Sequence, residues 1–382
     1  MDNQEDSYKI DFDEYILNAS PDKQEKGKLW ACAAGLQKAD GLTASEYLYE
    51  TAKKNIEGHI TVQQAKQLID SYYERKIIRT ENEKNAQEAD KVSARIAEIL
   101  SERTFSLSPA QFISIHKRLF TGIFSKVRAG ALRDYNITKK EWVLDGATVL
   151  YAGADLLQET LKYDFETEKN FDYSGLTQYE TIRHLTNFIA NLWQIHPFGE
   201  GNTRTTAVFA IKYFRALGFS AANELFEHNS WYFRNALVRA NYSDLSRGIH
   251  EDKSWLEKFL RCLALGEKHI FKNRNLHIRQ TGIYANIPEN DPEKGTDLVG
   301  ENKIHSFTGT KKANNDPVNV PEKIRKTFRA IAENPRMTAK KMAELLSVSE
   351  KTVKRHIKIL KDKNLIQRRG SDKKGYWEIA RH

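Results

Sequence analysis

The feature that most constrains this chain is a polar loop that leads directly into a helix, at residues 196–217. Residues 196–204 read His-Pro-Phe-Gly-Glu-Gly-Asn-Thr-Arg, and apolar residues then recur at helical spacing as far as Leu217. Such a chain must turn sharply and start an amphipathic helix at the same place. The first turn of a helix presents free backbone N–H groups and a positive dipole end, which favour phosphate. The first interpretation is therefore a site for nucleotide chemistry.

The loop also combines side chains suited to that chemistry. His196, with an ordinary pKa near ~6.5, can take a proton from a hydroxyl at neutral pH. Glu200 offers a hard oxygen ligand for Mg²⁺ that bridges two phosphates. Gly201 lets the backbone approach phosphates closely, and Asn202 and Arg204 can hold phosphate oxygens. Taken singly, His196 is more often structural, but the whole set in this order favours a functional site.

The rest of the composition indicates a cytoplasmic protein of two or three domains. Hydrophobic residues make up 40% of the chain and charged residues 29%, as in globular proteins. No apolar run of about 18 residues is present, so we expect no membrane helix and no membrane partner. The acidic N-terminus lacks the apolar segment of a secretory signal. Cys32 and Cys262 lie in apolar surroundings, which favours buried free thiols over a disulfide or metal site.

Positive charge is concentrated in residues 321–382. This segment holds 18 Lys and Arg against 7 Asp and Glu, a local net charge of +11. The total is +9, so the rest of the chain carries −2. A basic module on a nearly neutral body is typical of polyanion binding.

We predict a mainly α protein with one exception. Short helices are expected within residues 28–75, and residues 81–275 are predominantly helical in pattern. Residues 137–151 break the pattern, because they are rich in β-branched and aromatic residues around Asp145-Gly146. This pattern predicts a β-hairpin. The predicted parts are an N-terminal helical segment at 1–80, a central domain at 81–275, a polar linker at 276–320 and a basic domain at 321–382.

The basic domain has the element order of a winged helix-turn-helix. Helices are expected at 321–333, after Thr338 and at 349–363, followed by strands at 365–369 and 376–380. Double-stranded DNA is the expected partner, and docking of another protein is the alternative. The predicted DNA contacts are Ser349, Lys351, Thr352, Lys354 and Arg355 on the third helix, and Lys373 and Lys374 in the wing.

The loop at 196–204 resembles the signature of the Fic (Fido) family, HPFx(D/E)GNGRxxR. Three neighbouring features support the resemblance. Residues 129–133 match the family's G-x-x-R element, the predicted hairpin matches its target-docking flap, and residues 231–241 match the helix beside the nucleobase. The resemblance covers about residues 81–275. It implies a Fic-type helical domain with a β-hairpin flap.

The resemblance implies a protein adenylyltransferase that uses ATP and Mg²⁺. His196 would deprotonate a Ser, Thr or Tyr hydroxyl of a target protein, and that oxygen would attack the α-phosphate. Glu200 would hold the metal, and the flap would align the target by adding a strand. The implied nucleotide-binding residues are Gly201, Asn202, Thr203, Arg204, Leu237 and Asn241, and the implied flap residues are Trp142, Val143 and Leu144. Some of these residues have a structural alternative. Leu237 would then pack in the core, Asn241 would cap a helix, and Trp142, Val143 and Leu144 would belong to a packed edge hairpin.

The chain departs from the family signature at two positions. Thr203 replaces the second glycine, and Ala207 replaces the second arginine, which grips the γ-phosphate in the family. Residues 28–75 resemble, more weakly, the VbhA-like antitoxin domain, but the stretch 34–39 lacks its inhibitory glutamate. Because an unpaired buried charge is costly, the joint loss of arginine and glutamate is physically consistent. We therefore expect no autoinhibition of the glutamate type.

Two further hypotheses stay open beside adenylyl transfer. The chain is alternatively a DNA-binding transcriptional regulator whose Fic domain is inactive or senses nucleotides, or a Fic enzyme that transfers phosphate or another nucleotide moiety. Transfer of label from α-labelled ATP, compared with γ-labelled ATP, separates these cases. The sequence leaves open the target, the bound DNA sequence and the oligomeric state, with a homodimer among the options.

Overall fold

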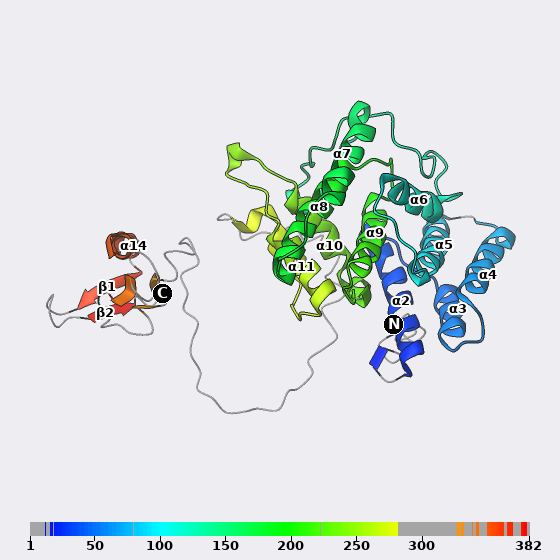
Figure 1. Cartoon of the computed structure of the whole chain (residues 1–382), viewed down its shortest axis with the longest axis horizontal. Coiled ribbons are helices and arrows are strands. Elements are labelled where there is room, and N and C mark those ends of the chain that lie inside the picture. The colour runs from blue at the N-terminus through cyan, green and yellow to red at the C-terminus, as the bar shows by residue number, and fades with distance from the viewer. Residues whose placement is uncertain are drawn as a thin grey trace. The chain divides into compact units, whose positions relative to one another are not determined.

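The computed structural model shows a chain that divides into two compact units, residues 1–295 and 296–382 (Figure 1). In the first unit the structure describes residues 12, 16, 17, 19–78, 80–221 and 223–281. In the second it describes residues 327, 328, 330, 331, 338, 341–343, 350–362, 365–369 and 376–379.

The described part of the first unit is mainly α-helical, as predicted. Its α-helices are α2 (Pro21–Gly35), α3 (Glu46–Ile56), α4 (Val62–Arg75), α5 (Glu81–Ser101), α6 (Pro109–Phe120), α7 (Leu157–Lys169), α8 (Gln178–Ile195), α9 (Asn202–Ala216), α10 (Phe226–Ala240) and α11 (Ser254–Leu265). Short 3₁₀ helices join them: η1 (Leu36–Asp40), η2 (Trp142–Leu144), η3 (Ala154–Leu156), η4 (Asn223–Leu225), η5 (Leu245–Arg247), η6 (Asn273–Leu276) and η7 (Ile278–Thr281). None of the described helices is long and apolar enough to cross a membrane.

Local sequence signals explain where several of these helices start. Thr61, Thr80 and Thr177 each form a capping box with the Gln or Glu three residues later. The threonine hydroxyl accepts a hydrogen bond from a free N–H, and the later side chain returns one to the cap. The helices expected within residues 28–75 are confirmed.

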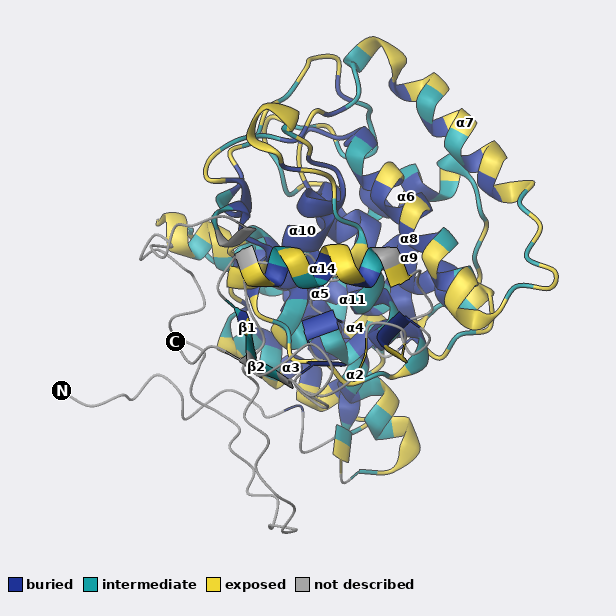
Figure 2. Ribbon diagram, turned by 90° about the vertical axis from the view of Figure 1, so that its left-hand side faces the viewer, coloured by how far each residue is buried: buried dark blue, intermediate teal, exposed yellow. Residues whose placement is uncertain are grey.

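One hydrophobic core joins the N-terminal helices to the central ones. Trp30 of α2, Trp193 of α8, Phe209 of α9 and Phe233 of α10 are all buried in it. Figure 2 shows this continuous buried centre in dark blue. The domain boundary predicted at residue 80 therefore does not separate two hydrophobic cores. Removal of the N-terminal helices would expose core surface of the central ones.

The predicted hairpin at residues 137–151 needs a correction. The chain does reverse at Asp145-Gly146, where φ is 58° and 83°. The N–H of Glu141 donates to the carbonyl of Ala147 at 2.9 Å. No strand forms within residues 137–151, because the 3₁₀ turn η2 lies between the two arms.

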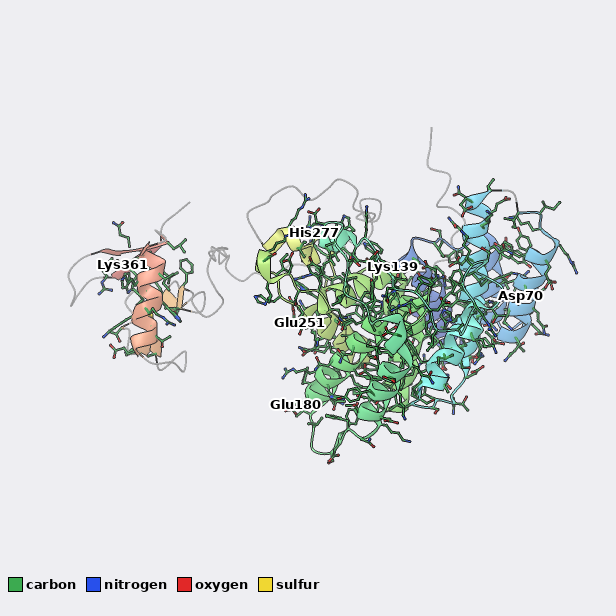
Figure 3. All side chains as sticks on the ribbon, turned by 90° about the horizontal axis from the view of Figure 1, so that it is seen from above. Asp70, Lys139, Glu180, Glu251, His277 and Lys361 are labelled. Atoms are coloured by element: carbon green, nitrogen blue, oxygen red, sulfur yellow. The ribbon has the colours of Figure 1, made fainter. Side chains whose placement is uncertain are left out.

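The start of the predicted linker at residue 276 also needs a correction. Leu276, His277 and Ile278 are buried in the first unit. His277, labelled in Figure 3, packs edge-on against Trp142, with ring centres 4.9 Å apart. Residues 276–281 thus belong to the folded body, and most of the predicted linker lies outside the described residues.

The second unit has the predicted winged helix-turn-helix elements. Helix α14 spans Glu350–Asp362, and the antiparallel strands β1 (Ile366–Arg369) and β2 (Tyr376–Ile379) follow it. Helical residues also occur at 327, 328, 330, 331 and 341–343. A separate small core gathers Phe328, Ile331, Met342, Val353, Leu360 and Ile366, and Trp377 of β2 packs against it.

Candidate functional site

The loop between α8 and α9 has a backbone that its sequence specifies. His196 ends α8 in the left-handed region, with φ 49° and ψ 56°. Gly201 precedes α9 with φ 77°. A Cβ at this glycine would lie 2.4 Å from the ring of Phe120. Both the backbone conformation and the space therefore require glycine at 201.

Two side chains hold the loop in place. The amide of Asn202 donates to the carbonyl of Phe198 at 2.7 Å and accepts from the N–H of Phe198 at 3.1 Å. Nε of Arg133 donates to the carbonyl of His196 at 2.8 Å. The backbone N–H of Arg133 donates to the carbonyl of Pro197. Asn202, predicted as a nucleotide ligand, is thus engaged within the loop. Arg133, in the G-x-x-R element, fixes the loop from outside.

His196 presents one unpartnered ring nitrogen in a buried place. Its side chain is only 2% exposed, and Nδ1 lies 3.2 Å from the carbonyl oxygen of Trp193. Because a carbonyl only accepts, Nδ1 carries the proton and Nε2 has the free lone pair. Nε2 has no hydrogen-bond partner in the described structure. Burial, aided by the cations of Lys139, Arg234 and Arg133, holds the pKa of His196 well below its ordinary value, so the ring is neutral.

The ring of Tyr151 covers His196. The two ring centres are 4.2 Å apart, and Tyr151 itself is buried. Burial raises the pKa of the Tyr151 hydroxyl above its ordinary range, and the carboxylate of Glu141 adds to the effect. The phenol is therefore neutral, and its ring packs against the buried imidazole.

Glu200 differs from its neighbours because it faces solvent. Its side chain is 53% exposed, and Oε2 lies 3.1 Å from Nζ of Lys139, which is labelled in Figure 3. Among the described residues no group of three or more His, Cys, Asp and Glu forms a metal cluster. Mg²⁺ commonly uses one or two carboxylates together with substrate phosphates and waters. An accessible single carboxylate fits that mode of binding.

Arg204 is held by acidic and amide groups from outside the loop. It is 2% exposed, Nη2 donates to Glu88 at 2.7 Å, and Nη1 donates to the side chain of Gln37 at 2.9 Å. Nε lies 2.7 Å from Oδ2 of Asp40. The guanidinium also stacks over the ring of Phe120, 4.8 Å from its centre. The predicted phosphate ligand is therefore already paired.

Asp40 connects Arg204 to a second arginine. Its Oδ1 lies 3.1 Å from Nη1 of Arg234, and Arg234 in turn binds both oxygens of Glu141 at 3.0 Å. Burial opposes ionisation of Asp40, but the two guanidinium groups hold its pKa below the ordinary value. Basic and acidic side chains thus alternate from Arg204 through Asp40 and Arg234 to Glu141, at the start of the 141–147 loop.

A cavity of about 470 Å³ lies beside this network. Its lining brings together Glu200 and Arg204 of the loop with Asp40, Glu88, Lys139, Trp231 and Arg234. Three cations, three carboxylates and an indole ring thus share one cavity. Of the predicted site residues, Glu200 and Arg204 line this cavity, and His196 is not among its lining residues.

Several predicted nucleotide-binding residues make structural contacts, and their role toward a nucleotide stays a prediction. Thr203 accepts from the indole N–H of Trp193 at 3.1 Å, and Leu237 is fully buried. The amide of Asn241 donates to the carbonyls of Ala190 and Leu237 at 3.0 Å. The alternatives of core packing at Leu237 and of a helix-end cap at Asn241 describe these contacts.

The predicted flap side chains are also packed inward. Val143 and Leu144 are fully buried, and Trp142 is half-buried against His277. Their packing fits the alternative of a packed turn, while docking of a target by added-strand pairing through the backbone stays a prediction. The inward packing follows from η2, which turns all three residues toward the body.

The predicted DNA-binding residues are only partly described. Lys354 and Arg355 are exposed on α14, and Thr352 is half-buried. Nζ of Lys354 lies 2.8 Å from Glu350, one turn earlier. Ser349, Lys373, Lys374 and the side chain of Lys351 lie outside the described residues.

Sequence reasoning missed Asp40, Glu88, His116, Lys139 and Arg234. Each lies in an ordinary helical or loop pattern, so its residue type alone carries no signal. Their roles depend on contacts between segments up to 194 positions apart, as between Asp40 and Arg234.

Comparisons with known proteins identify two domains in the chain. Residues 106–214 match the model of the Fic/DOC family. This part of the chain is a Fic domain. It contains the loop of residues 196–204, while the antitoxin resemblance of residues 28–75 stays a prediction. Residues 322–367 match a winged helix-turn-helix DNA-binding model, so the chain joins a Fic domain to a domain of that type.

Two solved structures are similar to the chain. One is the N-terminal FIC domain of Bep8, a VirB-translocated effector protein from Bartonella sp. 1-1C, with 20% identity and a TM-score of 0.38. The match covers 49% of this chain and 87% of the Bep8 domain. The other is a Fic family protein from Desulfovibrio desulfuricans G20, with 10% identity, a TM-score of 0.40, and coverage of 94% and 88%. The comparison with curated proteins gives no match.

Proposed function

We propose that this chain is a Mg²⁺-dependent protein adenylyltransferase with a DNA-binding C-terminal domain. The observation that carries the proposal is the lone pair of His196 Nε2, which is buried and unpartnered in the Fic loop. An unsatisfied buried acceptor costs free energy, and here it lies on the histidine of the Fic loop, where a catalytic role would explain it. A substrate hydroxyl is the donor that would satisfy it.

The proposed reaction is adenylyl transfer with His196 as the base. The hydroxyl of a target side chain gives its proton to Nε2 of His196, and its oxygen forms a bond to the α-phosphorus of ATP. The bond from that phosphorus to the pyrophosphate oxygen breaks, which gives AMP-protein and pyrophosphate. The Nδ1–H to Trp193 hydrogen bond orients the ring and favours the protonated form that results.

The phosphates have recognisable partners beside the base. The start of α9 offers free backbone N–H groups, and Arg204 and Lys139 line the adjacent cavity. Glu200 would hold Mg²⁺ together with phosphate oxygens. The bound ion supplies charge neutralisation to the phosphates.

The contacts in the structure also imply a restrained enzyme. Asp40 and Glu88 occupy Arg204, and Tyr151 covers His196. Nucleotide phosphates must compete with these carboxylates for the same guanidinium. The lack of glutamate-type autoinhibition stays a prediction, and two carboxylates, Asp40 and Glu88, pair with an arginine of the motif.

A labelling experiment tests the proposal. Full-length protein is incubated with α-labelled ATP and Mg²⁺, with and without a host lysate, and in parallel with γ-labelled ATP. We expect label on protein only from α-labelled ATP, and its loss in His196→Ala. Label from the γ-phosphate would indicate phosphotransfer, and equal labelling by the His196→Ala variant would remove this histidine from the mechanism.

The paired state of Arg204 favours one second candidate, a nucleotide-sensing regulator. In that case MgATP displaces Asp40 from Arg204 without transfer. Its expected signature is DNA binding that changes with MgATP, equally in wild type and in His196→Ala, with no label on protein.

A further inference from the structure

His116 lies on α6, fully buried beneath the Fic loop. Its ring stacks on Phe198 with centres 3.7 Å apart and planes 12° from parallel. Nδ1 lies 2.9 Å from the N–H nitrogen of Gly130, and Nε2 lies 3.0 Å from the carbonyl oxygen of Glu200. One ring therefore joins α6, the 129–133 segment and the Fic loop.

The partners of the two nitrogens determine the state of the ring. The backbone N–H of Gly130 only donates, so Nδ1 accepts, and the carbonyl of Glu200 only accepts, so Nε2 donates. Both bonds form only with a neutral ring that carries its proton on Nε2. Burial lowers the pKa of His116 to about 4, which agrees with a neutral ring.

The bond to Glu200 acts on a residue whose own side chain is not packed. Glu200 stands between Gly199 and Gly201, which offer no side chains to brace it. Its carboxylate is exposed and lies 3.1 Å from Nζ of Lys139, so its orientation depends on the Glu200 backbone and on this ion pair. The carbonyl bonded by His116 belongs to the same residue as that carboxylate.

We infer that His116 is a positioning residue that orients Glu200 toward a phosphate-bound divalent cation. The inference rests on the proposed function, and it names how the metal-binding side chain is held. A phenylalanine at this position would fill a similar volume and keep the stacking. It would lose both hydrogen bonds and release the Glu200 peptide.

The experiment compares two variants of full-length protein. His116→Phe removes both hydrogen bonds, and His116→Gln retains an amide that can donate to the carbonyl of Glu200. Phe112→Leu is the matched control, because Phe112 is buried one turn earlier on the same helix and also packs on Phe198. Binding of ATP is measured by calorimetry at increasing Mg²⁺, and in EDTA without Mg²⁺.

We expect His116→Phe to raise the Mg²⁺ concentration at half-saturation about tenfold, the lower range for loss of an outer-shell partner of a metal ligand. Binding of metal-free ATP should stay unchanged. His116→Gln should fall between wild type and His116→Phe, and serves alone if the latter fails to fold. Phe112→Leu should lower the unfolding temperature without moving the Mg²⁺ dependence.

A wild-type Mg²⁺ dependence in folded His116→Phe, or the same shift in Phe112→Leu, would overturn the inference. Glu200→Ala provides the link to the metal, because it must abolish most of the Mg²⁺ dependence. If it does so while wild type transfers no AMP, the proposed function fails and the inference stands. If Glu200→Ala leaves the Mg²⁺ dependence intact, or wild type binds no MgATP, the inference fails.

Discussion

The Fic loop and helix α14 both carry predicted functional side chains, but the loop buries them and the helix exposes them. In the loop, His196 and Arg204 are each 2% exposed, and the partners of Arg204 come from distant segments. On α14, Lys354 and Arg355 point into solvent. Chemistry on a phosphoryl group gains from preorganised groups in a site shielded from water. Capture of DNA phosphates needs only accessible cations and the release of counterions.

This contrast predicts how substitutions behave. A buried group is part of a network, so its loss leaves a partner unpaired, and effects are large and coupled. An exposed cation acts almost independently, so its loss has a small effect that depends on salt. The predictions below test that difference, from the largest expected effect to the smallest.

His196→Ala should lower AMP transfer by roughly 10²–10⁴-fold, the usual contribution of a general base. The fold should persist, because the ring donates only one hydrogen bond, to Trp193. Label transfer and a thermal unfolding curve measure the two effects. His250→Ala, at an exposed histidine, is the control and should transfer AMP normally. Transfer at the wild-type rate by His196→Ala would contradict the assigned role.

Gly201→Ala should lower the free energy of unfolding by about 3 kcal/mol, from left-handed strain and overpacking together. The added methyl would meet the ring of Phe120 at 2.4 Å. Gly58→Ala is matched to it, because φ is +84° there but nothing lies within 4 Å of the added Cβ. Urea unfolding should show a loss of only about 1 kcal/mol for Gly58→Ala. Equal losses for both variants would show that space in the Fic loop is not limiting.

Asp40→Asn should strengthen MgATP binding about tenfold, or about 1.4 kcal/mol. The neutral amide no longer competes with phosphate for Arg204, while Glu88 still prevents a bare buried charge. Calorimetry measures the affinity, and Asp22→Asn, at an exposed pair with Lys26, is the control. Unchanged or weaker binding would show that Asp40 does not restrain the site. Deletion of residues 1–75 is no substitute, because it removes Trp30 from the shared core.

Arg355→Ala should reduce the salt dependence of DNA binding by about one unit of slope in log Kd against log salt, as expected for one phosphate contact. Binding to different sequences should weaken by a similar factor. Lys84→Ala, at an exposed lysine of α5, is the control. Failure of the wild-type chain to bind random duplex at low salt would contradict a DNA role for the second unit.

Most of the local structure could be predicted from the sequence because its causes are local. The capping box at Thr61, the helix that begins at Asn202 and the amphipathic helix α14 each follow from residues within a few positions. The winged helix-turn-helix order follows for the same reason. The hairpin at 137–151 was harder to predict, because burial of Val143 and Leu144 depends on the body that they pack against.

The sequence by itself determined which groups the Fic loop holds: a base at His196, a carboxylate at Glu200 and an arginine at 204. Only the tertiary structure decided how each is engaged. Asn202 braces the loop, Arg204 pairs with Asp40 and Glu88, and His116 bonds the Glu200 peptide. The physical reason is that ion pairs and buried hydrogen bonds depend on distances through space, which local sequence patterns do not contain.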